Sequence, residues 1–178
     1  DFGQALKIAR ELGDAPLELW TLTVAANVEF FHLRARDTLE NASGAIELAV
    51  DAQDLKTEVT SRFWAAAAMW TMGDLPGLQS QAAAMLEGAE RLRDRYWLAS
   101  TLWRNETVCI LKGDWNAARE FNTRGLEVSE LDQRSISTRI LLEFHSGNIE
   151  SGTGFIETAL ELAGAGQFRP TPGLGYTT

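Results

Sequence analysis

Apolar residues recur along most of the chain at intervals of three and four positions, the spacing of one face of an α-helix. One such stripe is Leu39, Ala42, Ile46 and Ala49. It returns at three later points, namely Leu78, Ala82, Met85 and Ala89, then Ala118, Phe121, Gly125 and Val128, then Ile149, Gly152, Ile156 and Ala159. These stripes predict helices over 38–51, 75–92, 115–130 and 149–163. Small residues on each stripe indicate close approach of a neighbouring helix.

A second set of helices is predicted just before these, over 15–34, 55–72, 95–112 and 133–146. Two series of acidic or amide residues precede the two sets, and their side chains suit the free N–H groups that open a helix. The series are Asp14, Asp54, Asp94 and Asp132, and Asp37, Asp74, Asp114 and Asn148. Asp37 with Glu40 predicts an acidic capping box. The segment 20–31 has strand propensity, but the flanking periodicity favours a helix there.

The predicted fold is all-α, with two turn markers in every ~40 residues, as in stacked helical hairpins. We expect an α-solenoid of about four antiparallel hairpins over 1–163, with residues 1–13 as an extra leading helix. Residues 164–178, rich in Gly and Pro, are predicted to be a tail or linker. Neither end has the pattern of a solubilising cap, so we expect a piece of a longer protein. Its exposed ends would self-associate, or the tail would cover them through Phe168, Leu174 and Tyr176.

The segment 113–121, reading GDWNAAREF, resembles the turn and second helix of a tetratricopeptide repeat. The turn recurs at 72–74 and 146–148, as MGD and SGN. The spacing exceeds the ~34 residues of that family. Its small residue in the first helix is Ala66 in one repeat but Glu106 in another, and the terminal Pro is missing. The resemblance implies a tetratricopeptide-like fold.

A narrower resemblance is carried by the order of 94–98, 112–115 and 169–173, which read DRYWL, KGDW and RPTPG. This order is similar to helical regions of large bacterial MalT-like or LuxR-type transcription regulators and ATPase-linked adenylate cyclases. The resemblance implies a sensing or interaction arm that contacts a partner protein or other domains of its parent chain. The parts that would hydrolyse ATP, bind DNA or cyclise a nucleotide are not among these 178 residues.

No motif indicates catalysis, a metal or a cofactor. The segment 147–154 has glycines at P-loop-like spacing but lacks the lysine that reaches phosphate. His32, His145 and Cys109 lie in different repeats, too far apart to converge on a metal. Acidic pairs such as Glu127 and Glu130 have no accompanying nucleophile or histidine. We therefore expect a protein without enzymatic activity.

Charge and hydropathy limit the kinds of partner that the chain is expected to bind. The formal net charge is -9 and the isoelectric point is near 4.7, which disfavours nucleic acid. No apolar run of ~18 residues is present to span a membrane. Cys109, the single cysteine, suits a reducing cytoplasm.

Aromatic residues give the one candidate binding site. Five of the six tryptophans fall in the predicted first helices of the hairpins, which line the concave face in tetratricopeptide-type solenoids. Aligning these helices on their turn residues, with Arg36 taken as the first turn, places five rings in that groove: Phe30, Phe63, Trp70, Trp103 and Phe144. They would anchor an apolar protein segment, which makes a regulatory protein–protein interaction module the leading hypothesis. Two alternatives are a small apolar effector bound by the same rings, and rings that only fill gaps between hairpins.

Overall fold

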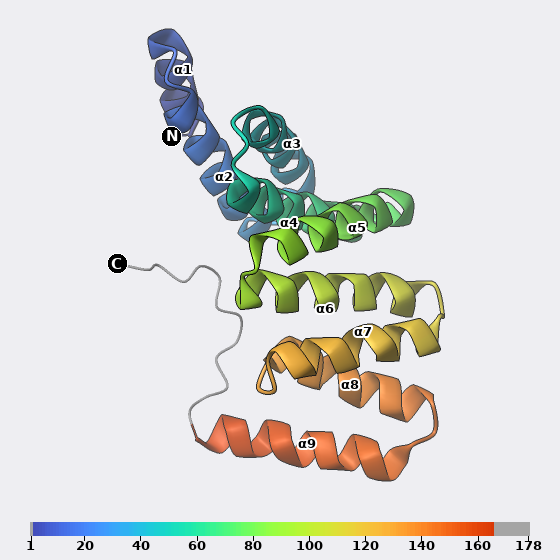
Figure 1. The fold of residues 1–178 in the computed structure, drawn as a ribbon. Coiled ribbons are helices and arrows are strands. Elements are labelled where there is room, and N and C mark those ends of the chain that lie inside the picture. The colour runs from blue at the N-terminus through green and yellow to red at the C-terminus, as the bar shows by residue number, and fades with distance from the viewer. Residues whose placement is uncertain (1, 166–178) are drawn as a thin grey trace.

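The computed structural model describes residues 2–165, and this part of the chain contains helices and turns but no strand. The all-α prediction is therefore confirmed, including the segment 20–31. The predicted anchors of the tail, Phe168, Leu174 and Tyr176, lie outside the described residues. Nine helices occupy the described range (Figure 1): α1 (Phe2–Leu12), α2 (Ala15–Phe31), α3 (Ala35–Asp51), α4 (Leu55–Met72), α5 (Leu75–Leu92), α6 (Arg95–Leu111), α7 (Trp115–Val128), α8 (Gln133–His145) and α9 (Ile149–Gly164).

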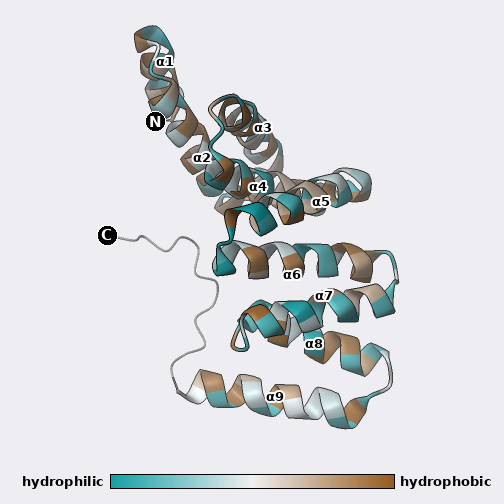
Figure 2. Cartoon of the chain, viewed as in Figure 1, coloured by the Kyte–Doolittle hydropathy of each residue, from teal (hydrophilic) through white to brown (hydrophobic). Residues whose placement is uncertain are grey.

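Helices that are adjacent in the chain are packed in succession (Figure 1). Each helix contacts the one before it and the one after it, and α2 also contacts α4, as α4 contacts α6. Figure 2 shows hydrophobic and hydrophilic residues mixed along the helices. No helix in the described range is long and apolar enough to cross a membrane.

The turns recur at a fixed interval over most of the chain. A residue in the left-handed backbone region follows a helix at positions 13, 33, 53, 73, 93 and 113, each 20 residues after the last, and again at 147. Glycine occupies four of these seven positions because it adopts a positive φ without steric penalty. At position 33 the residue is Leu, with a φ of 60°.

Most of the predicted N-caps are confirmed. The carboxylates of Asp14, Asp54, Asp74, Asp94, Asp114 and Asp132 each accept a hydrogen bond from a backbone N–H in the first turn that follows. Two predicted caps were wrong. The helix expected from residue 38 begins at Ala35 with Arg34 at its N-cap, so Asp37 lies within the first turn and forms no capping box. Asn148 occupies an N-cap position, but its side chain donates to Glu143 Oε2 instead, at 2.9 Å.

The buried core contains many alanines, and their small side chains let helices approach closely. One cluster joins α2, α3 and α4 through Ala26, Ala42, Trp64, Ala65 and Ala67. Another joins α4, α5 and α6 through Ala66, Leu78, Ala82, Met85 and Val108. Gly88 on α5 lies so close to α4 that an added Cβ would come within 2.7 Å of Val59 Cγ2. Close packing of this kind fixes the side chains that α4 and α6 present to each other.

Candidate functional site

Three of the five predicted ring residues meet around one arginine. Phe63 and Trp70 come from α4, and Trp103 comes from α6. The Cζ atom of Arg104 lies 4.9 Å from the ring centre of Phe63, 5.5 Å from that of Trp70 and 4.6 Å from that of Trp103. We call these four residues the arginine cage.

Phe30 and Phe144 lie outside the arginine cage. The Phe30 ring packs on Trp64, with 5.6 Å between ring centres, and Trp64 in turn contacts Phe63 at 5.1 Å. Phe144 on α8 packs against α9, where an added Cβ on Gly152 would come within 3.1 Å of its ring.

The alignment of the first repeat on Arg36 was wrong. The left-handed turn residue is Leu33, three positions earlier. Phe30 therefore stands three residues before its turn, as Trp70 stands before Gly73 and Phe144 before Gly147.

The rings of the predicted groove are unequally exposed. Trp70 is 45% exposed and Phe144 38%, whereas Phe30, Phe63 and Trp103 are half-buried. Trp64, by contrast, is buried between helices and fills a gap, as the alternative interpretation expects of a tryptophan. Trp70 is therefore the most exposed residue of the arginine cage, and Phe63 and Trp103 are partly accessible.

Arg104 was missed by the sequence analysis, yet it is the largest side chain that is fully buried in the described residues. It is 2% exposed, and neither Nε nor Nη1 has a hydrogen-bond partner. Burial, with the charge of Arg134 nearby, lowers the pKa of Arg104 to about 9, so the guanidinium remains a cation at neutral pH. The 40-residue period carried a signal, because position 104 corresponds to Trp64, a core residue.

Arg134 on α8 also lies near the Trp103 ring. Its Cζ atom is 5.6 Å from the ring centre of Trp103 and 5.6 Å from that of Tyr96. It donates to Ser100 Oγ at 2.9 Å and pairs with Asp132, with 2.7 Å between Nη2 and Oδ2. Burial alone would raise the pKa of Asp132, but hydrogen bonds and charge from Arg134 bring it below its usual value. Two guanidiniums thus lie near Trp103, and one of them, that of Arg134, is paired with Asp132.

A different buried carboxyl lies where α6, α7 and α8 meet. Glu106 is fully buried, and its Oε1 accepts from Asn122 Nδ2 at 2.9 Å while Oε2 has no partner. Asn122 also donates to the backbone oxygen of Ser135 at 2.7 Å. Burial raises the pKa of Glu106 to about 8, although the nearby Thr138 hydroxyl and the hydrogen bond from Asn122 oppose the shift. Glu106 is therefore mostly protonated at neutral pH, and it joins three helices.

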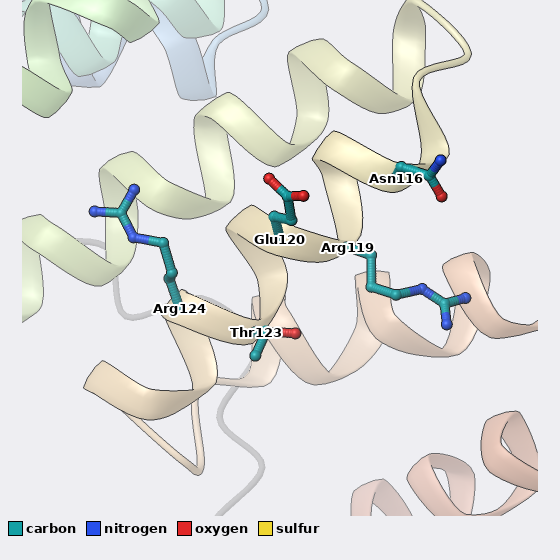
Figure 3. Close-up of a pocket in the computed structure, with 5 residues that line it drawn as sticks. All are labelled: Asn116, Arg119, Glu120, Thr123 and Arg124. Carbon is teal, nitrogen blue, oxygen red and sulfur yellow. The ribbon is translucent and has the colours of Figure 1, made fainter.

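A hollow of about 650 Å³ lies on the outer side of α7 (Figure 3). The residues that line it are polar or charged in type and come from one helix: Asn116, Arg119, Glu120, Thr123 and Arg124. Arg119 pairs with Glu143 and Arg124 with Glu90, both at 3.2 Å. In Figure 3 the labelled side chains diverge rather than converge on a common point. Side chains that diverge in this way do not enclose a small ligand.

Other candidate chemistry is not assembled in the described part of the chain. Residues 2–165 contain no group of three or more His, Cys, Asp or Glu side chains that could hold a metal. His145 stacks on Trp115, with ring centres 4.7 Å apart. Burial raises the pKa of the half-buried Cys109 thiol.

Fold and site together define an all-helical protein with a buried, unpaired arginine enclosed by aromatic rings. No protein-family model matches the chain, and no curated protein matches its sequence. The resemblance to tetratricopeptide repeats and to bacterial regulators therefore stays a prediction.

Proposed function

We propose that this chain is a non-enzymatic protein–protein interaction module built as a tetratricopeptide-like α-solenoid. In this proposal α2–α3, α4–α5, α6–α7 and α8–α9 are four antiparallel hairpins, preceded by α1. Two observations support it: the 20-residue recurrence of the turns, and the contacts of α2 with α4 and of α4 with α6. Stacked hairpins produce contacts of this kind between alternate helices.

The observation that carries the proposal is the arginine cage. Phe63, Trp70 and Trp103 converge from two first helices onto Arg104, and Trp70 remains 45% exposed. Tryptophan and arginine are the residues most enriched at the energetic centres of protein interfaces. We place the docking face along α4 and α6, with Phe30 and Phe144 at its margins.

The proposed partner is a protein segment, supplied by another protein or by another domain of the parent chain. We propose a role as the sensory or regulatory arm of a larger bacterial regulator in the cytoplasm. The net charge of -9 favours a protein partner over nucleic acid. The alternative is a small apolar effector bound by the same rings; the hollow on α7 is lined by none of them.

The test is a selection of peptides from a random library displayed on phage, with the wild-type chain as bait. Selected peptides are expected to bind Trp70→Ala about tenfold or more weakly, because truncating an interface anchor loses roughly 2 kcal/mol. The matched control is Trp20→Ala, which removes a 64% exposed tryptophan of α2. Equal binding to wild type and Trp70→Ala, with weakened binding to Trp20→Ala, would place the docking face elsewhere.

A further inference from the structure

We propose that Arg104 receives a carboxylate of the bound partner, from an aspartate or glutamate side chain within an otherwise apolar segment. The inference rests on the proposed docking face and names the chemistry of what docks there. Apolar side chains of the segment would cover Phe63, Trp70 and Trp103, and its carboxylate would pair with the guanidinium.

The buried guanidinium of Arg104 lacks a hydrogen-bond partner at two of its nitrogens. Buried charges in proteins are normally paired and hydrogen-bonded, because an unpaired one loses its hydration without compensation. Arg104 is 2% exposed, and its Nε and Nη1 have no acceptor. The three rings offset part of this loss through cation–π attraction. They provide no oxygen to accept from either nitrogen, and a carboxylate oxygen would accept from one of them.

The charges of Arg104, Arg134 and Asp132 do not cancel. Arg104 and Arg134 both lie against Trp103, at 4.6 and 5.6 Å. Asp132 accepts two hydrogen bonds from the guanidinium of Arg134, at 3.2 and 2.7 Å, so it satisfies the second arginine. One positive charge is left over in a chain whose net charge is -9. A single carboxylate complements this site, whereas a polyanion would meet the acidic remainder of the surface.

Exposed aromatic residues beside the two arginines indicate how a partner segment would approach Arg104. Trp70 is 45% exposed and its ring lies against Arg104, so a partner that contacts Trp70 comes close to the guanidinium. Each arginine has an exposed aromatic residue beside it, Trp70 beside Arg104 and Tyr96 beside Arg134. Aromatic contacts at both arginines favour a segment that runs across the site and offers a side chain, rather than one that ends there.

The experiment uses end-blocked peptide pools made of Leu, Phe and Ser, with one central residue that is Glu in one pool and Gln in the other. Binding to the wild-type chain is measured by fluorescence anisotropy. The Glu pool is expected to bind about tenfold or more tightly, because a charge-assisted hydrogen bond contributes about twice as much as a neutral one. Arg104→Met is expected to abolish this preference. Arg124→Met, on the outer side of α7, should leave it intact.

The outcomes separate the inference from the function on which it rests. Equal binding of both pools to the wild type, or a preference that survives Arg104→Met, would overturn the carboxylate site and leave the docking face standing. Failure of both pools, together with failure of the display selection, would reject the docking face itself. Tight binding of a Gln pool with a free C-terminal carboxylate would show that the assigned source, a side chain, is wrong. Arg104→Lys guards against misfolding, since it keeps the charge and should retain part of the preference.

Discussion

At the scale of single residues, the unusual feature is a cation in a position that the preceding repeat fills with an indole. Arg104 and Trp64 both stand nine positions before a turn glycine, Gly113 and Gly73 respectively. Trp64 is buried in an apolar cluster. Arg104 is also surrounded by aromatic rings, but it carries a charge that has no partner. A group that lowers stability in the unbound protein is a common property of binding sites.

Arg104→Met is therefore expected to stabilise the protein while it weakens binding. Methionine has a similar length, packs well against aromatic rings and removes the unpaired charge. We expect a gain of about 1–3 kcal/mol in the free energy of unfolding, seen as a rise of several degrees in Tm. Thermal denaturation followed by circular dichroism measures it. A fall in Tm would mean that the cation–π contacts outweigh the desolvation of Arg104.

Glu106 should make stability depend on pH. Its pKa is raised from 4.5 to about 8 in the folded chain, so folding favours the protonated form. The stabilisation is complete below pH 4.5, is lost progressively as pH rises and is gone above about pH 8. Glu106→Gln, which is neutral throughout, should unfold at higher denaturant than wild type, and the gap should widen from about pH 5.5 to pH 8. The limiting slope is about 1.4 kcal/mol per pH unit. Parallel profiles for the two proteins would show that Glu106 is ionised in both states.

At the scale of elements, helices were predictable where the chain places an aspartate at the start of each. These carboxylates cap six helices as expected. The exception is α3, whose N-cap Arg34 makes no side-chain cap, so the nearby Asp37 suggested a later start. The preceding turn is made by Leu33, and a leucine gives no sign of the left-handed conformation it adopts.

Leu33→Gly should stabilise the α2–α3 turn. Leucine at a φ of 60° is strained by its Cβ, and its 86% exposure means that little packing is lost on removal. We expect a gain of about 1 kcal/mol in chemical denaturation. Gly73→Ala is the mirror control. It introduces a Cβ at a φ of 76° into open space and should lose a similar amount. A neutral Leu33→Gly would show that the turn relaxes around leucine.

The approach of α5 to α4 gives a matched pair of glycine substitutions. Gly88→Ala places a Cβ 2.7 Å from the buried Val59, and we expect a loss of about 1–2 kcal/mol from overpacking. Gly154→Ala on α9 meets no atom within 4 Å and should gain about 0.5–1 kcal/mol through helix propensity. Urea denaturation of both variants measures the difference. Equal effects would contradict the close contact between the two helices.

At the scale of the whole molecule, the sequence predicted which helices supply the site but not its centre. Counting back from the turn glycines selected Phe63, Trp70 and Trp103, which meet at Arg104, and also Phe144, which lies outside the arginine cage. Arg104 did not follow, because an arginine in a helix usually extends into solvent and only the packing of α4 against α6 buries it.

The last described helix leads us to expect self-association. On α9, Leu160 is 66% exposed and Ile149 54%, which leaves apolar surface beyond the contact with α8. We expect light scattering to show a molar mass that rises with concentration, and Leu160→Lys to prevent the rise. Leu131→Lys, at a 57% exposed position between α7 and α8, is the control. A wild-type chain that stays monomeric at every concentration would refute this expectation.

The central claim is that a partner segment docks on the arginine cage, and fluorine NMR locates the contact most directly. All six tryptophans are replaced by 5-fluorotryptophan, and each resonance is assigned with a single Trp→Phe variant. A peptide from the display selection is then titrated into the labelled chain. The account predicts that the resonances of Trp70 and Trp103 shift, while those of Trp20 and Trp115 stay in place. Shifts confined to Trp20 or Trp115 would contradict it.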